Sequence, residues 1–268
     1  PKVLAEPLVS GATAADRSGV SLYGSVLRDG GRWRLWHQAW PETYDGRDVA
    51  LVGCLESDDG LDWRRPSYGL LECGGSTANH LTDLPFHCPS VVIDPHAATG
   101  ARYRAFGYSE PAMIAGHPQR ITQAGYYSAR SADGLHWQMY PKNPVLPGGD
   151  TCTLAQDPRT GEYLAFHKRT LIHRGEKRRL VYLSVSGDMQ QWSEPSLVMA
   201  LDEIDDQQTR REGGRYSQFY NMSVFPYGAQ FLGLVTHFRF TGSPAVKKGP
   251  SQSPDDGPID VQLVHSRD

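Results

Sequence analysis

A seven-residue pattern, Ser-x-Asp-Gly-x-x-Trp, recurs along the chain and constrains its fold more than any other feature. It stands as "SDDGLDW" around Asp59, as "SADGLHW" around Asp133 and as the variant "SGDMQQW" around Asp188. A fourth, partial copy is "HSRD", which ends at Asp268. Asp-Gly suits a tight turn because Gly accepts positive φ and Asp hydrogen-bonds the nearby backbone. We interpret the pattern as a structural repeat, with its Trp between neighbouring units, and not as a catalytic motif.

Each copy of the pattern closes a unit with the same internal order. A strand that opens on a small or polar residue, such as "CPSVVID", is followed by a tight turn and an aromatic alternating strand, such as "RYRAFGY". A third strand, such as "AGYYSARS", follows a variable loop. The period-two patterns predict antiparallel strands, and no stretch shows a helical period. The units cover about residues 18–70, 85–145, 148–198 and 216–268 of one domain that spans residues 1–268.

Tandem units of four antiparallel strands predict a β-propeller. A propeller removes its exposed sheet edges by closing its ring. The fourth unit stops inside its turn, so either residues 1–20 supply the missing outer strand or the natural protein continues past Asp268 into a fifth blade. We favour the second alternative. The sequence therefore predicts an all-β fold, a five-bladed propeller of four-stranded blades whose last blade is missing or truncated in this chain.

Composition argues against several classes of protein. The net charge of −3 gives no basis for binding nucleic acid or an anionic membrane, and no apolar run is long enough for a transmembrane helix. The four cysteines form no CxxC pair, so we expect buried free thiols and neither a zinc ribbon nor a redox motif. No signal peptide is visible, and the sequence leaves the compartment, cytoplasmic or secreted, and the oligomeric state open.

The strand openings carry a resemblance to a known group. The segments "CPSVVIDP" and "DTCTLAQDPRTGEYLAFHKR", each followed by the repeated turn, resemble the five-bladed propeller glycosidase superfamily of invertases, levanases, arabinanases, xylosidases and mannoside phosphorylases. The resemblance covers about residues 18–268 and implies a carbohydrate substrate at a central pit. In these families three acidic residues open the innermost strands of the first three blades. The corresponding openings here hold Tyr23, then His87 and Cys88, then Asp150, so one carboxylate remains.

The resemblance makes Asp150 and His87 the first candidates for catalysis. Glycoside hydrolysis generally needs two carboxyl groups across the scissile bond. Asp150 could act as base, nucleophile or proton relay, and His87 as acid or base near neutral pH. A missing carboxylate could come from a loop, and we favour Asp45 and Glu212 because each lies near aromatic and Gly residues that could fold over a pocket.

Further polar and aromatic residues are candidates for sugar binding. Some open the inner strands, one is an aromatic residue after the first hairpin, and two end the second strands of later blades: Tyr23, Gln218, Tyr220, Asn221, Trp40, His167 and Arg239. One histidine per blade is not a metal-ligand spacing by itself, so we assign no metal ligand and expect no cofactor. A structural metal ion in the central channel stays an open alternative.

These residues predict a carbohydrate-active enzyme, a glycoside hydrolase that acts on a small or terminal sugar at the central pit. One alternative is a non-catalytic glycan-binding propeller, which predicts aromatic residues around the pit and no two carboxyl groups within about 5–10 Å of each other. Another is a phosphorylase-like enzyme, which holds phosphate with cationic residues and needs a single carboxyl group as proton donor. We expect a carbohydrate partner, and neither nucleic acid nor a membrane.

Overall fold

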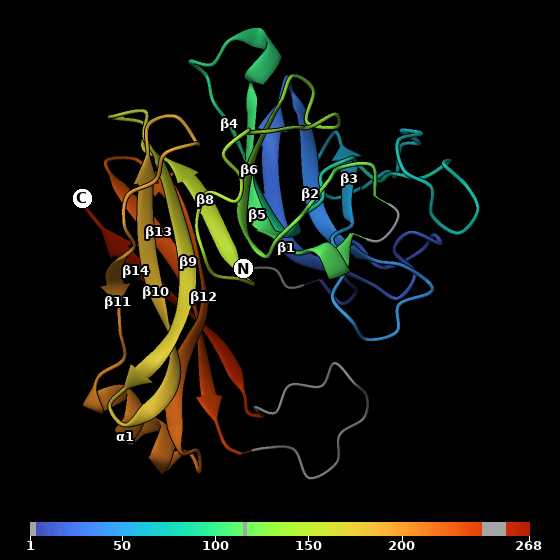
Figure 1. The fold of residues 1–268 in the computed structure, drawn as a ribbon. Coiled ribbons are helices and arrows are strands. Elements are labelled where there is room, and N and C mark those ends of the chain that lie inside the picture. The colour runs from blue at the N-terminus through green and yellow to red at the C-terminus, as the bar shows by residue number, and fades with distance from the viewer. Residues whose placement is uncertain (1–3, 115–116, 243–255) are drawn as a thin grey trace.

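The computed structural model describes residues 4–114, 117–242 and 256–268. Its strands form four antiparallel sheets, here called blades one to four, and each blade takes consecutive strands of the chain (Figure 1). Blade one has the order β1-β2-β3, blade two β4-β5-β6-β7, blade three β8-β9-β10-β11 and blade four β12-β13-β14. Every paired strand is antiparallel to its neighbour, as the alternating patterns predict.

The strands alternate with short turns and with longer loops on the outside of each blade. In chain order they are β1 (Gly19–Asp29), β2 (Arg32–Trp40), β3 (Val52–Ser57), β4 (His87–Ile93), β5 (Tyr103–Ser109), β6 (Gly125–Ser131), β7 (Gln138–Met139), β8 (Cys152–Gln156), β9 (Tyr163–His173), β10 (Glu176–Ser186), β11 (Ser196–Met199), β12 (Tyr216–Tyr227), β13 (Gln230–Phe240) and β14 (Ile259–Ser266). Two short 3-10 helices, Thr99–Ala101 and Pro111–Met113, and the helix α1 (Glu203–Arg211) complete the elements.

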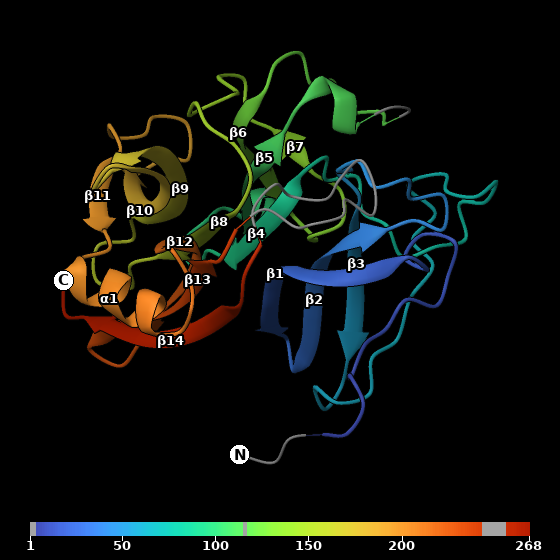
Figure 2. The ribbon, with the colours of Figure 1, turned by 90° about the horizontal axis from the view of Figure 1, so that it is seen from below.

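The first strands of the four blades lie side by side around a common channel. β1 contacts β4, β4 contacts β8, and β8 contacts β12. Figure 2 shows these four strands toward the centre of the molecule, with the later strands of each blade farther out. Together they line a cavity of about 640 Å³. This arrangement confirms the predicted propeller architecture.

Blade one differs from the predicted four-stranded unit, because it is a sheet of three strands, whereas the three strands of blade four agree with the predicted incomplete fourth unit. In blade one the segment after the repeated turn makes only an isolated bridge, Glu56 to Arg64, where blade two forms the short strand β7. A single bridge leaves the outer position of blade one without a regular strand.

The repeated Ser-x-Asp turns are held by one set of hydrogen bonds. In blade two, Asp133 Oδ1 accepts from the Ser131 hydroxyl at 3.0 Å and from two following backbone N–H groups at 2.8 and 2.9 Å. Gly134 follows with a φ of 77°, a conformation that favours glycine. The serine-to-aspartate bond is present in all four copies, Ser57–Asp59, Ser131–Asp133, Ser186–Asp188 and Ser266–Asp268. The repeat therefore has the structural role that the sequence predicts.

Removing this aspartate from a turn is expected to destabilise the fold. Asp133→Ala deletes the acceptor of two backbone N–H groups, a loss similar to that of a helix N-cap, and costs about 1–2 kcal/mol of unfolding free energy. Burial raises the pKa of Asp133, but hydrogen bonds from His136, Leu135 and Ser131 outweigh it and lower the pKa from 3.8 to about 2. The stabilisation is therefore complete above about pH 4 and lost as the pH falls through 2.

Urea unfolding of Asp133→Ala and wild type at pH 7 and at pH 3 measures this effect. The matched control is Asp62→Ala, which removes an exposed carboxylate from the blade-one turn and is expected to leave the midpoint unchanged. A difference between Asp133→Ala and wild type that grows on acidification would contradict the assigned role.

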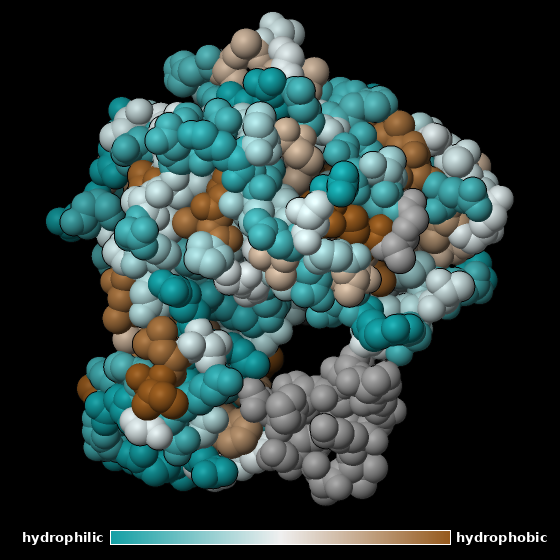
Figure 3. Space-filling model, viewed as in Figure 1, coloured by the Kyte–Doolittle hydropathy of each residue, from teal (hydrophilic) through white to brown (hydrophobic). Residues whose placement is uncertain are grey.

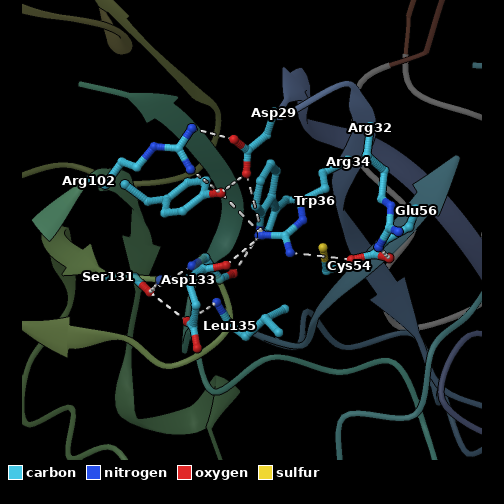
Figure 4. Close-up of polar contacts among 12 residues, drawn as sticks. Asp29, Arg32, Arg34, Trp36, Cys54, Glu56, Arg102, Ser131, Asp133 and Leu135 are labelled. Atoms are coloured by element: carbon cyan, nitrogen blue, oxygen red, sulfur yellow. Dashed lines mark hydrogen bonds and ion pairs between the residues drawn. The ribbon is translucent and has the colours of Figure 1, made fainter. Parts of the chain in front are cut away.

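Polar side chains join blade one to blade two (Figure 4). Arg34 donates to the Asp133 carbonyl at 2.6 Å and to the Tyr103 hydroxyl at 3.2 Å, and its guanidinium lies 3.3 Å from a Glu56 carboxylate oxygen. The indole of Trp36, which is fully buried, donates to the Gly134 carbonyl at 2.8 Å. These hydrogen bonds connect the repeated turn of blade two to strand β2 of blade one.

Two of the three tryptophans of the repeat, Trp137 and Trp192, pack between blades as predicted, whereas Trp63 lies outside these clusters. Trp137 belongs to the core cluster that Trp36 and Tyr103 form between blades one and two. Trp192 lies against Phe106, with ring centroids 5.0 Å apart, between blades two and three. Apolar burial of this kind supplies the main stabilising term of a propeller, because each blade buries its faces only against its neighbours.

The prediction that no segment is helical is wrong at α1. Asp202 and Asp205 form a capping box at its start, with the Asp202 carboxylate accepting from Ile204 N at 2.7 Å. The buried pair of Arg178 and Asp206, 2.6 Å apart, anchors the helix to strand β10. A nine-residue helix has too short an apolar stripe to give a recognisable helical period in the sequence. A tertiary ion pair holds this helix in place instead.

The surface and the thiols agree with the composition. The face in Figure 3 is mostly hydrophilic, with separate apolar patches. All four cysteines are free, and three of them, Cys54, Cys88 and Cys152, are buried. Within the described ranges no helix combines the length and apolar character needed to cross a membrane.

Candidate active site

The openings of strands β4 and β8 bring three reactive side chains together. One donor atom each from His87, Cys88 and Asp150 lies within 4.8 Å of the other two. Four non-glycine residues have positive φ in the described part of the chain, and two of them are Cys88, at 52°, and Asp150, at 77°. Such backbone conformations cost about 1–3 kcal/mol and gather at functional sites. Two strained residues converge where the inner strands β4 and β8 begin, at a point outside the residues that line the 640 Å³ cavity. This meeting point, here called the pit, is the candidate active site.

A buried cation holds Asp150. The Lys168 ammonium, from strand β9, forms an ion pair with the Asp150 carboxylate, and the lysine side chain is 8% exposed against 39% for the aspartate. Burial lowers the pKa of Lys168, and the negative charge of Asp150 opposes that shift. The lysine nitrogen also lies 4.5 Å from the centre of the Tyr220 ring. Asp150 is therefore oriented by the protein and still reached by solvent.

His167, the residue before this lysine, points to the other face of β9. Its ring lies 5.4 Å from that of Tyr126, centroid to centroid, and its Nε2 lies 3.3 Å from the Ser184 hydroxyl. Adjacent residues of a strand face opposite sides, so only one of the pair can reach the pit. His167 is the residue that the sequence suggests for sugar binding, whereas Lys168 is the residue of this pair that contacts Asp150.

The His87 imidazole is buried at the wall of the pit. Its Nδ1 lies 3.4 Å from the Val49 carbonyl oxygen, a contact that favours a proton on Nδ1 and leaves Nε2 for proton exchange. The rings of Tyr23 and Trp40 lie 6.3 and 6.0 Å from it, centroid to centroid. Two of the predicted sugar-binding aromatic residues therefore border the predicted acid or base.

Blade four closes the pit with polar and aromatic groups. The hydroxyls of Tyr23 and Tyr220 hydrogen-bond each other, and burial raises the pKa of both. Arg179 donates to the Gln218 side-chain oxygen at 3.0 Å, and its guanidinium lies 5.2 Å from the centre of the Tyr220 ring. Gln218 and Tyr220 therefore both contact Arg179 of blade three, and Tyr220 also contacts Lys168.

An acidic groove of about 590 Å³ adjoins the pit, and Tyr44, Asp45, Asp48, Val49 and Glu110 are among its lining residues. Val49 is shared with the pit, since its carbonyl contacts His87. The charges of Asp48 and Asp150 both raise the pKa of the Tyr23 hydroxyl, although burial is the larger cause. Two carboxylates therefore act on the same wall of the pit.

Asp45 itself lies at the exposed rim of this groove. Its carboxylate accepts from Arg47 Nε at 2.9 Å, and this pairing lowers the pKa of Asp45. Glu110 accepts from the Tyr108 hydroxyl at 2.8 Å. Asp45 is the residue of this loop that the sequence favours as a catalytic carboxylate. The structure adds Asp48 as a candidate, because its charge adds to burial in raising the pKa of Tyr23. No local motif distinguishes Asp48 in the sequence.

Three further predicted residues make contacts outside this group. Glu212 follows α1 and pairs with Arg239, which also pairs with Asp260, at the α1 end of blade four (Figure 1). Asn221 lies at a bulge in β12 and accepts from the neighbouring Met222 N at 2.8 Å. None of these contacts joins Asp150 or His87, and the roles of these three residues stay predictions.

Only the comparison with solved structures finds proteins that are similar to this chain. No family model matches the sequence, and no curated protein matches it. A thermostable family-43 glycoside hydrolase aligns with a TM-score of 0.57 at 12% identity, over 93% of this chain and 69% of that one. An N-acetylgalactosamine deacetylase from F. plautii, solved with blood group B trisaccharide, aligns at 0.55 and 13%, over 90% and 71%.

A Bombyx mori GH32 β-fructofuranosidase aligns with a TM-score of 0.50 at 15% identity, over 90% of this chain and 45% of that one. At such identities the likeness shows the fold alone. This chain therefore has the β-propeller fold of the family-43 and family-32 glycoside hydrolases, which is the fold that the strand openings implied.

Proposed function

We propose that this protein is a glycoside hydrolase that cleaves a small or terminal sugar at the central pit. The observation that carries the proposal is the convergence of His87 and Asp150, from two different blades, on strained strand openings. The shared fold with carbohydrate-active enzymes supports it. The reacting groups are the Asp150 carboxyl group, held by Lys168, and the His87 imidazole, whose Nδ1 contacts the Val49 carbonyl.

The separation of these groups favours a retaining mechanism. Retaining enzymes place their two catalytic groups about 5–5.5 Å apart, whereas inverting enzymes leave about 6.5–9.5 Å for a water molecule. One ring nitrogen of His87 and one carboxylate oxygen of Asp150 lie within 4.8 Å of each other, which is closer than an inverting site requires. In this proposal Asp150 attacks the anomeric carbon and becomes a glycosyl ester, and Lys168 stabilises the carboxylate charge before the attack and again when hydrolysis of the ester restores it. His87 starts as the imidazolium, donates its Nε2 proton to the leaving oxygen and then accepts one from the incoming water.

The surroundings of the pit provide the binding groups. Tyr23 and Tyr220 offer hydroxyls, and Trp40 offers an aromatic face beside His87. The groove that contains Asp48 and Glu110 would accept hydrogen bonds from the hydroxyls of the leaving group.

Phosphorolysis is a second candidate, because cations lie beside the single carboxylate of the pit. Lys168 contacts Asp150, and its nitrogen lies 4.5 Å from the centre of the Tyr220 ring. The Arg179 guanidinium lies 5.2 Å from the centre of the same ring. Lysine and arginine are the usual phosphate-binding side chains. Under this alternative phosphate is the nucleophile, and a single protein group donates the proton.

A panel of nitrophenyl glycosides, assayed with and without inorganic phosphate, separates these functions. We expect nitrophenol release that is independent of phosphate, and NMR of the first sugar product is expected to show the anomeric configuration of the substrate. Accumulation of a sugar 1-phosphate would favour phosphorolysis instead. Binding of the sugars without any release would leave a glycan-binding propeller and contradict the proposal.

A further inference from the structure

A second cluster of ligand-type side chains lies inside blade one, away from the pit. Asp16 precedes strand β1, His37 is on β2, and His80 is in the loop between β3 and β4. The three side chains are fully buried, and one donor atom of each lies within 4.8 Å of the other two. The two imidazole rings stack with their centroids 5.4 Å apart. Nothing in the proposed hydrolysis uses this cluster.

Three of its four ring nitrogens lack hydrogen-bond partners among the described residues. His37 Nε2 and both ring nitrogens of His80 are buried without one, and His80 Nε2 lies 3.5 Å from the nearer Asp16 oxygen. His37 Nδ1 lies 3.2 Å from the Gln38 carbonyl oxygen, which places the proton on Nδ1 and the lone pair on Nε2. Metal-binding histidines have this arrangement, with the second nitrogen donating to a carbonyl.

The carboxylate is oriented toward the rings. Asp16 Oδ1 accepts from the backbone N–H groups of Ala12 and Thr13, at 3.1 and 2.8 Å, and from the Thr13 hydroxyl at 2.8 Å. Its Oδ2 faces His80 and also accepts from Arg65, at 2.7 Å. Arg65 is the competing cation, and a bound ion would take over this oxygen from it. The arginine side chain is 20% exposed and so has a route toward solvent.

Glycine at position 53 makes room for both rings. A Cβ atom there would lie 2.4 Å from His37 Nε2 and 2.7 Å from His80 Cδ2. Any larger residue would push the two imidazoles away from each other. The backbone of β3 is therefore shaped to admit two stacked histidines with their unpartnered nitrogens close together.

We propose that Asp16, His37 and His80 bind one zinc ion. Two imidazole nitrogens and one carboxylate oxygen are a donor set that zinc prefers, and three protein ligands leave one position of its tetrahedron for a further ligand. Zinc–ligand distances of about 2.0–2.2 Å bring donor atoms to roughly 3.3–3.6 Å of one another. His80 Nε2 and Asp16 Oδ2, 3.5 Å apart, already lie at such a separation, and the donor atom of His37 lies within 4.8 Å of the other two.

The ion would connect three segments that are distant in sequence. It would tie the residues before β1 and the loop after β3 to the middle of β2. Gln38, next to His37, donates to the Val49 carbonyl at 2.8 Å and accepts from Cys88 N at 3.2 Å. The zinc site would thus stabilise the end of β2, where Gln38 hydrogen-bonds the backbone at the His87 and Cys88 opening. Its role would be structural.

Metal analysis of the full chain tests this inference independently of enzymatic activity. Wild-type protein is stripped with a chelator, incubated with zinc, desalted and analysed by mass spectrometry of the metal. We expect one zinc per chain and a higher melting temperature with zinc than without. His80→Gln and His37→Gln are expected to retain less than about a tenth of the zinc, because each removes a ligand.

Asp150→Asn is the matched control, since His87, Cys88 and Asp150 form the other cluster of potential ligands. It is expected to keep the full zinc content. Cobalt added to stripped wild type gives a second readout that needs no variant to fold, and we expect tetrahedral d–d absorption without a sulfur-to-cobalt charge-transfer band. Stripped wild type that takes up no stoichiometric zinc, loss of zinc in Asp150→Asn, or a sulfur band from Cys88 would each overturn the proposal.

Discussion

Replacing Asp150 with asparagine is expected to lower kcat/KM for the best glycoside by about four orders of magnitude. Removal of one member of a catalytic group typically costs this much, because the remaining groups cannot replace its chemistry. Asparagine has nearly the same shape as aspartate but no anionic oxygen to attack the anomeric carbon. The loss is therefore expected in kcat, with KM changed by less than about tenfold. Steady-state kinetics of Asp150→Asn against wild type measures both constants.

Two controls make this result specific. Asp62→Asn removes an exposed carboxylate from the outer turn of blade one and is expected to leave both constants unchanged. Circular dichroism of Asp150→Asn checks that loss of the ion pair with Lys168 has not unfolded the protein. A folded Asp150→Asn that keeps more than about a tenth of wild-type kcat would exclude Asp150 as the nucleophile, and Asp48 would become the next carboxylate to replace.

Replacing Trp36 with alanine is expected to lower the free energy of unfolding by about 3–5 kcal/mol, the usual cost of deleting a large buried aromatic side chain. Trp36 is fully buried, its ring lies 5.7 Å from that of Tyr103, and its indole donates to the Gly134 carbonyl at 2.8 Å. The substitution leaves a cavity between blades one and two and removes one of the two indole donors to the Gly134 carbonyl, the other being Trp137 at 3.1 Å. Urea unfolding followed by tryptophan fluorescence and by circular dichroism measures the change.

Trp63→Ala provides the comparison within the same blade. Trp63 is half-buried, and its indole donates within its own turn, to the Gly60 carbonyl at 3.2 Å, and not across a blade interface. It lies outside the core cluster between blades one and two. We expect it to destabilise the protein by less than half as much as Trp36→Ala. Equal losses from the two substitutions would show that the interface between blades one and two does not carry the stability assigned to it.

The repeat allowed most of the fold to be predicted because its signals are local. Ser131, Asp133 and Gly134 determine a turn by bonds within a few residues, and strand alternation determines which side chains face the core. The helix α1 could not be predicted in the same way. It depends on the buried ion pair between Asp206 and Arg178, which are 28 residues apart in sequence.

The candidate site likewise has residues that local signals predict and contacts that depend on tertiary structure. Tyr23, His87, Asp150 and Tyr220 were predictable because inner strands of a propeller all open at the central pit. The contact between Lys168 and Asp150 depends instead on which face of β9 the lysine takes. The coupling of Asp48 to the pit depends on the path of a loop, for which the sequence carries no periodic signal.

The central claim is that the sugar binds where His87 and Asp150 meet. A crystal structure of Asp150→Asn soaked with a glycoside that wild type hydrolyses tests it most directly. The proposal predicts a sugar in the pit, with its anomeric carbon about 3–3.5 Å from the side chain at position 150 and its glycosidic oxygen within hydrogen-bonding distance of His87. A sugar bound only in the groove beside Asp45, or elsewhere on the surface, would contradict it.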